Sequence, residues 1–79
     1  MTDFSIKLRY RISSRGGILF VRELQFGEVV ARIPSSKSTL VASDAVEVAA
    51  ECRSFFLGQI ESVVHDDDVV HVICCVSKK

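Results

Sequence analysis

Apolar and polar residues alternate along the first part of the chain. Between Phe4 and Ile12 every even position is apolar, and the odd positions carry serine, lysine or arginine. Period-two alternation over this length is typical of a β-strand with one buried face and one solvent-facing face. The paired glycines Gly16-Gly17 supply the positive φ angles of a hairpin turn. We therefore expect the chain to return as a second strand over residues 18–26.

The register of this second strand is ambiguous, because apolar residues occupy both parities. Ile18 and Phe20 fall on one parity. Leu19 and Val21 fall on the other and compete for the buried face. A β-bulge near residues 22–23 would reconcile the two patterns, since a bulge shifts the alternation by one residue.

A third strand is predicted over residues 28–33, with Pro34 closing it because proline lacks the N–H that a β-ladder needs. Residues 35–42 are expected to form a connecting loop. The third strand would complete a three-stranded antiparallel unit before any helix begins.

A helix is predicted to begin at Ser43-Asp44 and to run for about four turns, roughly 22 Å. Asp44 and Glu47 resemble a capping box, and both acids suit the positive end of the helix dipole. Gly58 is placed where a left-handed C-terminal cap is expected. The buried stripe of this helix would consist of Ala45, Val48, Ala49, Cys52, Phe55 and Phe56.

Beyond Gly58 the pattern has two interpretations. A strand over residues 60–65, an aspartate turn at 66–68 and a last strand over 69–76 would form a hairpin; the alternative is a helix that continues to Val64. The β-branched pair Val63-Val64 and the three aspartates favour the hairpin. The predicted fold is α+β, a small antiparallel sheet in the order β-β-β-α-β-β with one helix packed on one face, and residues 1–79 form a single compact domain.

Composition narrows the class of protein. The 79 residues are 48% hydrophobic, which excludes a disordered chain. No secretory signal or membrane-spanning run is evident, so we expect a cytoplasmic protein without a membrane partner. Three cysteines make a poor disulfide framework, and Cys74 and Cys75 must point to opposite faces of a strand. They are interpreted as small apolar core residues in a reducing compartment.

The predicted last strand, residues 69–76, is apolar on both faces, as is much of 18–21. Strands of this kind are normally covered on both sides, yet one helix covers only one face of a sheet. The second layer would then be a second copy, giving a homodimer, or a different protein. The alternative is that strand twist and end effects hide these residues within a monomer.

Charge is divided unevenly along a chain whose formal net charge is zero. Seven basic and three acidic residues precede Ser43, and the ratio is reversed after it. Cations at alternate positions of one strand project from one sheet face, where they can bind an anionic partner. The alternative is a solvated face with cross-strand pairs to Glu23 and Glu28. The predicted partner-binding residues are Lys7, Arg9, Arg11, Arg15, Arg22 and Arg32.

Recognisable catalytic chemistry is sparse. His65 and His71 flank the aspartate turn and could face each other across the hairpin, but no nucleophile turn or paired catalytic carboxylates accompany them. Adjacent cysteines in a strand lack the spacing of zinc ligands, and no glycine-rich phosphate loop opens a helix. We expect no catalytic residues, no metal and no cofactor.

These features predict a small, non-enzymatic binding module that docks on a macromolecular partner, chiefly a protein, as an inhibitor or adaptor. On size class alone, such modules include phage or mobile-element proteins that block a host complex such as a CRISPR effector. The alternative is a nucleic-acid-binding module that uses the basic strand face. An enzyme built around the two histidines is the remote third interpretation.

Overall fold

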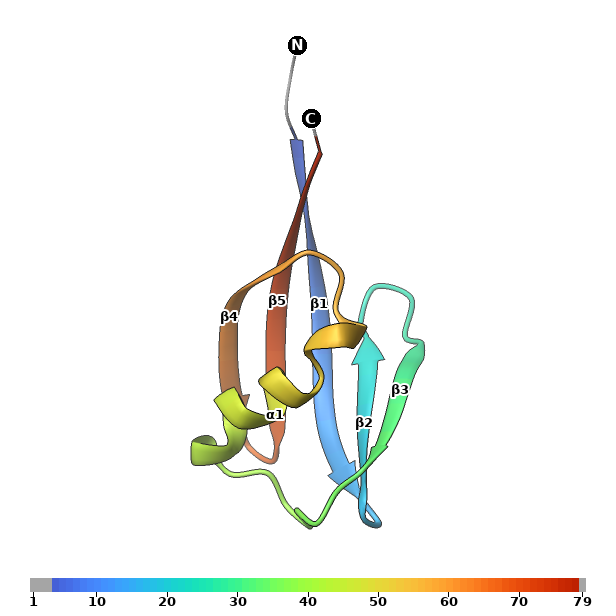
Figure 1. Ribbon diagram of the computed structural model, residues 1–79, viewed down its shortest axis with the longest axis vertical. Coiled ribbons are helices and arrows are strands. Elements are labelled where there is room, and N and C mark those ends of the chain that lie inside the picture. Colours follow the sequence, from blue (N-terminus) through green and yellow to red (C-terminus); the bar gives the residue numbers. More distant parts are fainter. Residues whose placement is uncertain (1–3, 79) are drawn as a thin grey trace.

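One antiparallel sheet of five strands dominates the computed structural model, which describes residues 4–78. The spatial order is β3-β2-β1-β5-β4, so the first and last strands lie side by side at the centre (Figure 1). The strands are β1 (Phe4–Arg15), β2 (Ile18–Glu23), β3 (Val29–Pro34), β4 (Gln59–Asp66) and β5 (Val69–Lys78). The structure is a mostly-sheet α+β fold with one short α-helix, which lies between the third and fourth strands of the chain.

A short helical segment crosses one face of this sheet (Figure 1). It comprises the 3-10 turn η1 (Ala42–Asp44), the helix α1 (Ala45–Glu51) and the 3-10 turn η2 (Arg53–Phe55). Even-numbered residues of β1 and β5 point toward it, as the alternation predicts. No helix described in residues 4–78 has the length and apolar character to cross a membrane. The core contains Tyr10, Ile12, Leu19, Val21, Leu40, Val48, Cys52, Phe56, Val70, Val72 and Cys74.

The register of β2 is resolved in favour of one parity. Leu19 and Val21 are fully buried, so Ile18 and Phe20 lie on the opposite face. The predicted bulge near residues 22–23 is wrong, because burial alternates without interruption along β2. The shift in the β2–β3 pairing comes from β3, where Val30 is the extra residue between the partners of Val21 and Arg22. The strand ends at Glu23 rather than at residue 26, because a turn begins there.

That turn is closed by the side chain of Glu23. Its carboxylate accepts hydrogen bonds from the backbone N–H groups of Gln25, at 2.7 Å, and Phe26, at 2.9 Å. A carboxylate that satisfies backbone donors in this way competes with the β-ladder and favours a turn. Glu23 is consequently buried and directed away from the basic strand face.

The prediction of a four-turn helix is wrong. The α-helix ends at Glu51, and Cys52 (φ −92°, ψ 4°) leads into 3-10 geometry. The capping box is also displaced, because the Asp44 carboxylate accepts from the N–H of Val41 at 3.0 Å. That hydrogen bond, together with the nearby Lys37 ammonium, lowers the pKa of Asp44. Glu47 forms a salt bridge with Lys37 at 3.5 Å.

The helix ends early because its C-terminal flank is attached to the sheet. The Phe56 ring packs on the Tyr10 ring with centroids 4.8 Å apart, and the N–H of Leu57 donates to the Tyr10 hydroxyl at 3.2 Å. Two ordered contacts to the central strand hold these residues in an extended path. Phe56 thus packs on β1 from a loop, whereas Phe55, which was also predicted in the buried stripe, is 43% exposed.

Gly58 is no helix cap but a point of close approach between this loop and β5. A Cβ on Gly58 would lie 2.3 Å from the carbonyl oxygen of Cys75, and the residue has φ +83°. Both the contact and the left-handed backbone require glycine. The hairpin of β4 and β5 follows, which confirms the predicted hairpin and excludes the longer helix to Val64.

The outer part of β1 departs from the predicted core. Phe4 is 53% exposed and Ile6 is 49% exposed, although both share the parity of the buried Tyr10 and Ile12. The helical segment covers β1 only around Tyr10 and Ile12, whereas the alternation of apolar and polar residues starts at Phe4. This leaves an apolar row on a part of the sheet that projects beyond the helix (Figure 1).

We predict that Gly58→Ala destabilises the protein far more than Gly16→Ala. Both positions have positive φ, which costs alanine about 1 kcal/mol, but Gly16 has open space around it and Gly58 meets backbone atoms of β5. Urea unfolding of both variants measures the difference, and a gap of at least about 1–2 kcal/mol is expected from the added clash. Equal losses would contradict the close approach.

Candidate partner-binding face

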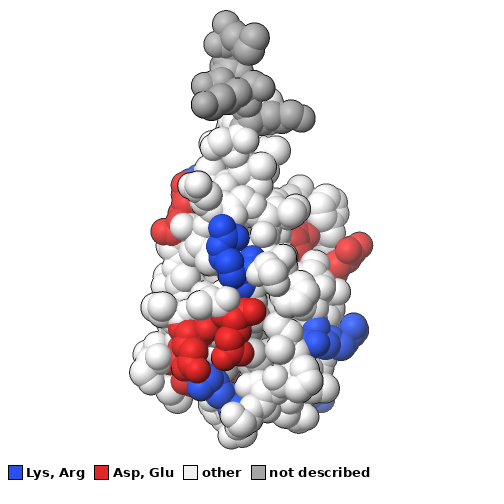
Figure 2. All heavy atoms as spheres, viewed as in Figure 1, with Lys and Arg blue, Asp and Glu red and all other residues white. Residues whose placement is uncertain are grey.

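The face of the sheet opposite α1 is covered by no element in the described part of the chain; we call it the open face. On β1 it carries the odd-numbered residues from Ser5 to Arg15. The helix side differs in character: Figure 2, seen from that side, shows acidic and basic side chains interspersed around the helical segment. Charges of both signs are thus mixed on the helix side, whereas the charged residues of β1 on the open face are all basic.

Four arginines from three strands gather on the open face, and we call them the arginine cluster. Arg11 and Arg22 are direct cross-strand partners, and Arg32 is paired with Phe20. The cluster borders a shallow hollow of about 350 Å³. The residues that line the hollow are Arg11, Ser13, Arg15, Phe20, Arg22, Val29 and Arg32.

The arginine cluster has no carboxylate partner among residues 4–78. The salt bridges of this region involve Lys7 and Lys37 only. The cross-strand pairs to Glu23 and Glu28, which were the alternative interpretation of this face, do not form. Glu23 is used in the β2–β3 turn, and Glu28 forms no salt bridge with a described residue. Like charges directly opposite each other in a sheet are destabilising. Arg11 and Arg22 therefore form a like-charge pair that no carboxylate of residues 4–78 balances, although the Arg22 guanidinium donates a hydrogen bond to the carbonyl oxygen of Gly27.

Lys7 and Arg9, the other two predicted residues, lie farther along β1. The Lys7 ammonium forms a salt bridge with the Glu61 carboxylate, which lowers the pKa of Glu61 and raises the pKa of Lys7. Arg9 borders a second hollow of about 290 Å³ with Lys7, Leu24 and Gln25. The structure thus brings five of the six predicted residues to the open face without an acidic partner, and Lys7 is the exception.

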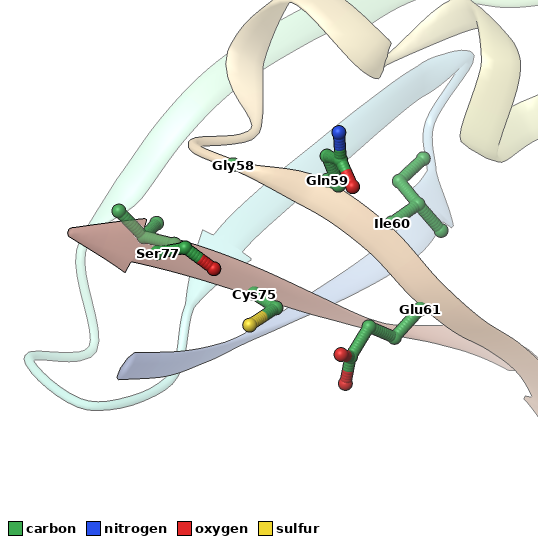
Figure 3. Close-up of a pocket in the computed structure, with 7 residues that line it drawn as sticks. Gly58, Gln59, Ile60, Glu61, Cys75 and Ser77 are labelled. Carbon is green, nitrogen blue, oxygen red and sulfur yellow. The ribbon is translucent and has the colours of Figure 1, made fainter. Parts of the chain in front are cut away.

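A larger hollow, about 440 Å³, lies between the start of β4 and the end of β5 (Figure 3). Figure 3 shows the Glu61 and Cys75 side chains pointing to the same side of the sheet. Glu61 is the charged residue of this hollow, and its charge is already balanced by Lys7. The arginine cluster is the stronger candidate because its charges are unbalanced.

Beside the arginine cluster the open face becomes apolar. Val69 and Ile73 of β5 are half-buried, and Val64 of β4 is 53% exposed. Cross-strand pairing places Ile73 next to Arg9, and Val64 next to His71. The open face is therefore cationic over β1, β2 and β3 and more aliphatic over β4 and β5.

The two histidines lie on opposite faces of the sheet. His65 pairs with the buried Val70, and its Nε2 lies 2.9 Å from the carbonyl oxygen of Leu40. His71 pairs with Arg11 on the open face. The expectation that they could face each other is wrong, because they occupy different parities of the hairpin. Among the described residues no three His, Cys, Asp or Glu side chains form a group able to hold a metal ion.

The three cysteines are free thiols in two different environments. Cys52 and Cys74 are buried in the core, where burial raises the pKa of Cys52 to about 11 and also raises the pKa of Cys74. Cys75 is half-buried on the open face, opposite Lys7. The predicted opposite orientation of the adjacent pair is confirmed.

Two residues of the open face are missed when the sequence is read alone. Phe20 is missed because either parity of β2 could have been the buried one, although its parity with Arg22 was a usable signal. Glu61 is missed because the β4–β5 pairing shifts between Ile60 and Ser62. That irregularity sets the Glu61 carboxylate beside Lys7.

No protein-family model, curated protein or solved structure matches this chain.

We predict one reactive thiol in the native protein and three after unfolding. Cys75 is accessible at the sheet surface, whereas Cys52 and Cys74 are protected by burial and by a raised pKa. Titration with an aromatic disulfide reagent at pH 8, with and without denaturant, measures both numbers. Reaction of all three thiols under native conditions would contradict the core described above.

We also predict that Arg11→Glu stabilises the fold. It places a carboxylate opposite Arg22 and replaces a like-charge pair by an opposite-charge pair, a gain of about 0.5 kcal/mol. Arg53→Glu is the matched control, because it makes the same charge change on the helix side, where Arg53 is exposed. A loss of stability in urea unfolding of the Arg11 variant would show that the arginine cluster is not electrostatically strained.

Proposed function

We propose that this protein is a non-enzymatic binding module that docks the open face of its sheet on an acidic surface of a partner protein. The observation that carries the proposal is the arginine cluster, four guanidinium groups on three strands without a carboxylate partner among residues 4–78. Arginine forms bidentate contacts with carboxylates and is enriched at binding hot spots. An acidic partner would offset the repulsion that the free protein bears.

The composition of the open face supports a protein partner over a nucleic acid. The cations of this face that have no carboxylate partner among residues 4–78 are all arginines, and Val64, Val69 and Ile73 lie on the neighbouring strands β4 and β5. Arginine next to a desolvated apolar area is typical of protein interfaces. Nucleic-acid-binding domains generally have a strongly basic pI, whereas this chain has a pI of about 6.7.

Phe20 provides the argument for the alternative, a nucleic-acid-binding module. It is half-buried between Ser13 and Arg32 on the open face, and an aromatic ring among arginines can stack on a base. The two functions differ in their salt dependence. Binding to duplex DNA weakens with a slope of about −0.9 per neutralised phosphate, whereas salt chiefly slows association with a protein.

An inhibitor and an adaptor differ in what the partner does after docking. An inhibitor occupies a surface that the partner needs, while an adaptor leaves it accessible and connects it to another component. A phage or mobile-element inhibitor of a host complex is one form of the first case. The three free cysteines suit a reducing compartment, so we place the partner in the cytoplasm.

The proposal predicts that Arg11→Glu/Arg22→Glu loses the partner, with affinity falling at least tenfold, about 1.4 kcal/mol. Wild-type protein, this double variant and the Arg53→Glu control are immobilised and exposed to host lysate, in parallel with and without nuclease treatment. The partner is the protein retained by wild type and control and lost by the double variant. Its affinity for the purified protein is then measured from 50 to 500 mM salt.

Two results would contradict the proposal. Equal retention by the double variant, with normal urea unfolding, would show that the interface lies outside the arginine cluster. Retention abolished by nuclease, together with tight binding of an oligonucleotide and a steep salt slope, would favour the nucleic-acid alternative.

A further inference from the structure

The central strands extend beyond their neighbours and form a two-stranded arm (Figure 1). Pairing of β1 with β5 continues to Phe4, whereas pairing of β1 with β2 begins only at Tyr10. The edge of β1 over residues 4–8 on the β2 side is therefore paired with no described segment, and we call it the free edge. Unpaired strand edges readily accept another strand.

The direction of the backbone groups on this edge follows from the neighbouring hydrogen bond. The carbonyl of Arg9 accepts from the N–H of Leu24, so Arg9 directs its backbone groups toward the β2 side. The N–H and C=O of one strand residue point to the same side, and the side alternates along the strand. Ser5 and Lys7 consequently direct two N–H and two C=O groups outward from the free edge.

The side chains of the free edge alternate in the same register. Phe4, Ile6 and Leu8 lie on the helix-side face of the arm, where Phe4 and Ile6 are exposed and Leu8 is half-buried. Ser5 and Lys7 lie on the open face. Lysine on an edge strand usually discourages pairing, but here the charge of Lys7 is balanced by Glu61.

We infer that two copies of this chain associate by antiparallel pairing of their free edges, centred on Ile6. In this register Ser5 of each copy lies opposite Lys7 of the other, and the two residues exchange both of their backbone hydrogen bonds. All four outward N–H and C=O groups of each copy are then satisfied. The pairing is self-complementary, as a two-fold interface requires.

The same register also matches the side chains. Ile6 meets Ile6 of the second copy, and Phe4 of each copy meets Leu8 of the other, so six apolar side chains form one row. A shift of one residue would set apolar residues against the serine and lysine row. The pairing is limited to residues 4–8, because Leu24 occupies the edge at Arg9.

Proline scanning of the two outer edges tests the interface. Ser5→Pro removes an N–H that only the second copy would use, and Ser77→Pro is the matched control, because Ser77 is the cross-strand partner of Ser5 on the opposite edge of the arm. Light scattering after size exclusion at 10–500 µM is expected to give twice 8.7 kDa for wild type and Ser77→Pro at high concentration. Ser5→Pro is expected to remain monomeric with unchanged thermal unfolding.

A wild-type monomer throughout this concentration range would overturn the inference. So would a dimer that Ser77→Pro abolishes and Ser5→Pro leaves intact, because pairing would then use the β5 edge. If both variants lose the native fold, the register is decided by crosslinking.

Crosslinking is tested in a Cys75→Ser background. In the proposed register the Ile6 Cα atoms of the two copies form a non-hydrogen-bonded pair about 4.5 Å apart, within the range of a disulfide. Ile6→Cys should therefore give a covalent dimer under mild oxidation. Phe4→Cys is the control, because its Cα atoms would lie four residues out of register, more than about 12 Å apart. Crosslinking of Phe4→Cys in preference to Ile6→Cys would overturn the proposed register.

Discussion

The antiparallel pairing of β1 with β5 is the constraint on which the rest of the structure depends. The hairpins β1–β2 and β4–β5 are local, but neither buries a face on its own. Pairing Tyr10 with Val72, and Ile12 with Val70, joins them into one sheet. Only this joined sheet offers a surface wide enough for α1. Because it closes a loop of some sixty residues, the pairing must be stabilised by the core that it creates.

The two faces of the central strand β1 also carry different kinds of residue. Its even positions include the core residues Tyr10 and Ile12, and its odd positions carry the cations of the open face, which we propose as the binding surface. Arg11 is the clearest case: a carboxylate at that position would suit the sheet better, since Arg22 is its direct partner. Sequence positions that reduce the stability of a fold without a structural reason are typical of functional surfaces.

Much of this architecture could be predicted from period-two alternation and turn chemistry. The β1 strand and the β4–β5 hairpin follow from them, because both depend on residues close in sequence. The helix length could not be predicted, since Phe55 and Phe56 continue a helical spacing while the hydroxyl of Tyr10 holds the following residue in the loop. That interaction joins segments far apart in the chain, and no local pattern encodes it.

The candidate site was likewise predictable where it depends on local pattern and not where it depends on contacts between distant segments. Alternation placed Arg9 and Arg11 on one face, but it did not indicate that Glu23 would serve the backbone of a turn instead of pairing with them. The alternation within β1 also does not show how far β2 and the helical segment extend along it. For that reason Phe4 and Ile6 were predicted to be core residues although they are exposed.

The open face and the arm are connected by symmetry. A two-fold axis that pairs the free edges in one sheet runs perpendicular to that sheet, because Ile6 of both copies lies on the same side. In the proposed dimer the two open faces would also share one side, and the two arginine clusters would face in the same direction. A partner with repeated acidic sites would bind both clusters, and the second contact would be intramolecular. Weak docking by one small domain can become tight through this geometry, without a larger interface on either copy.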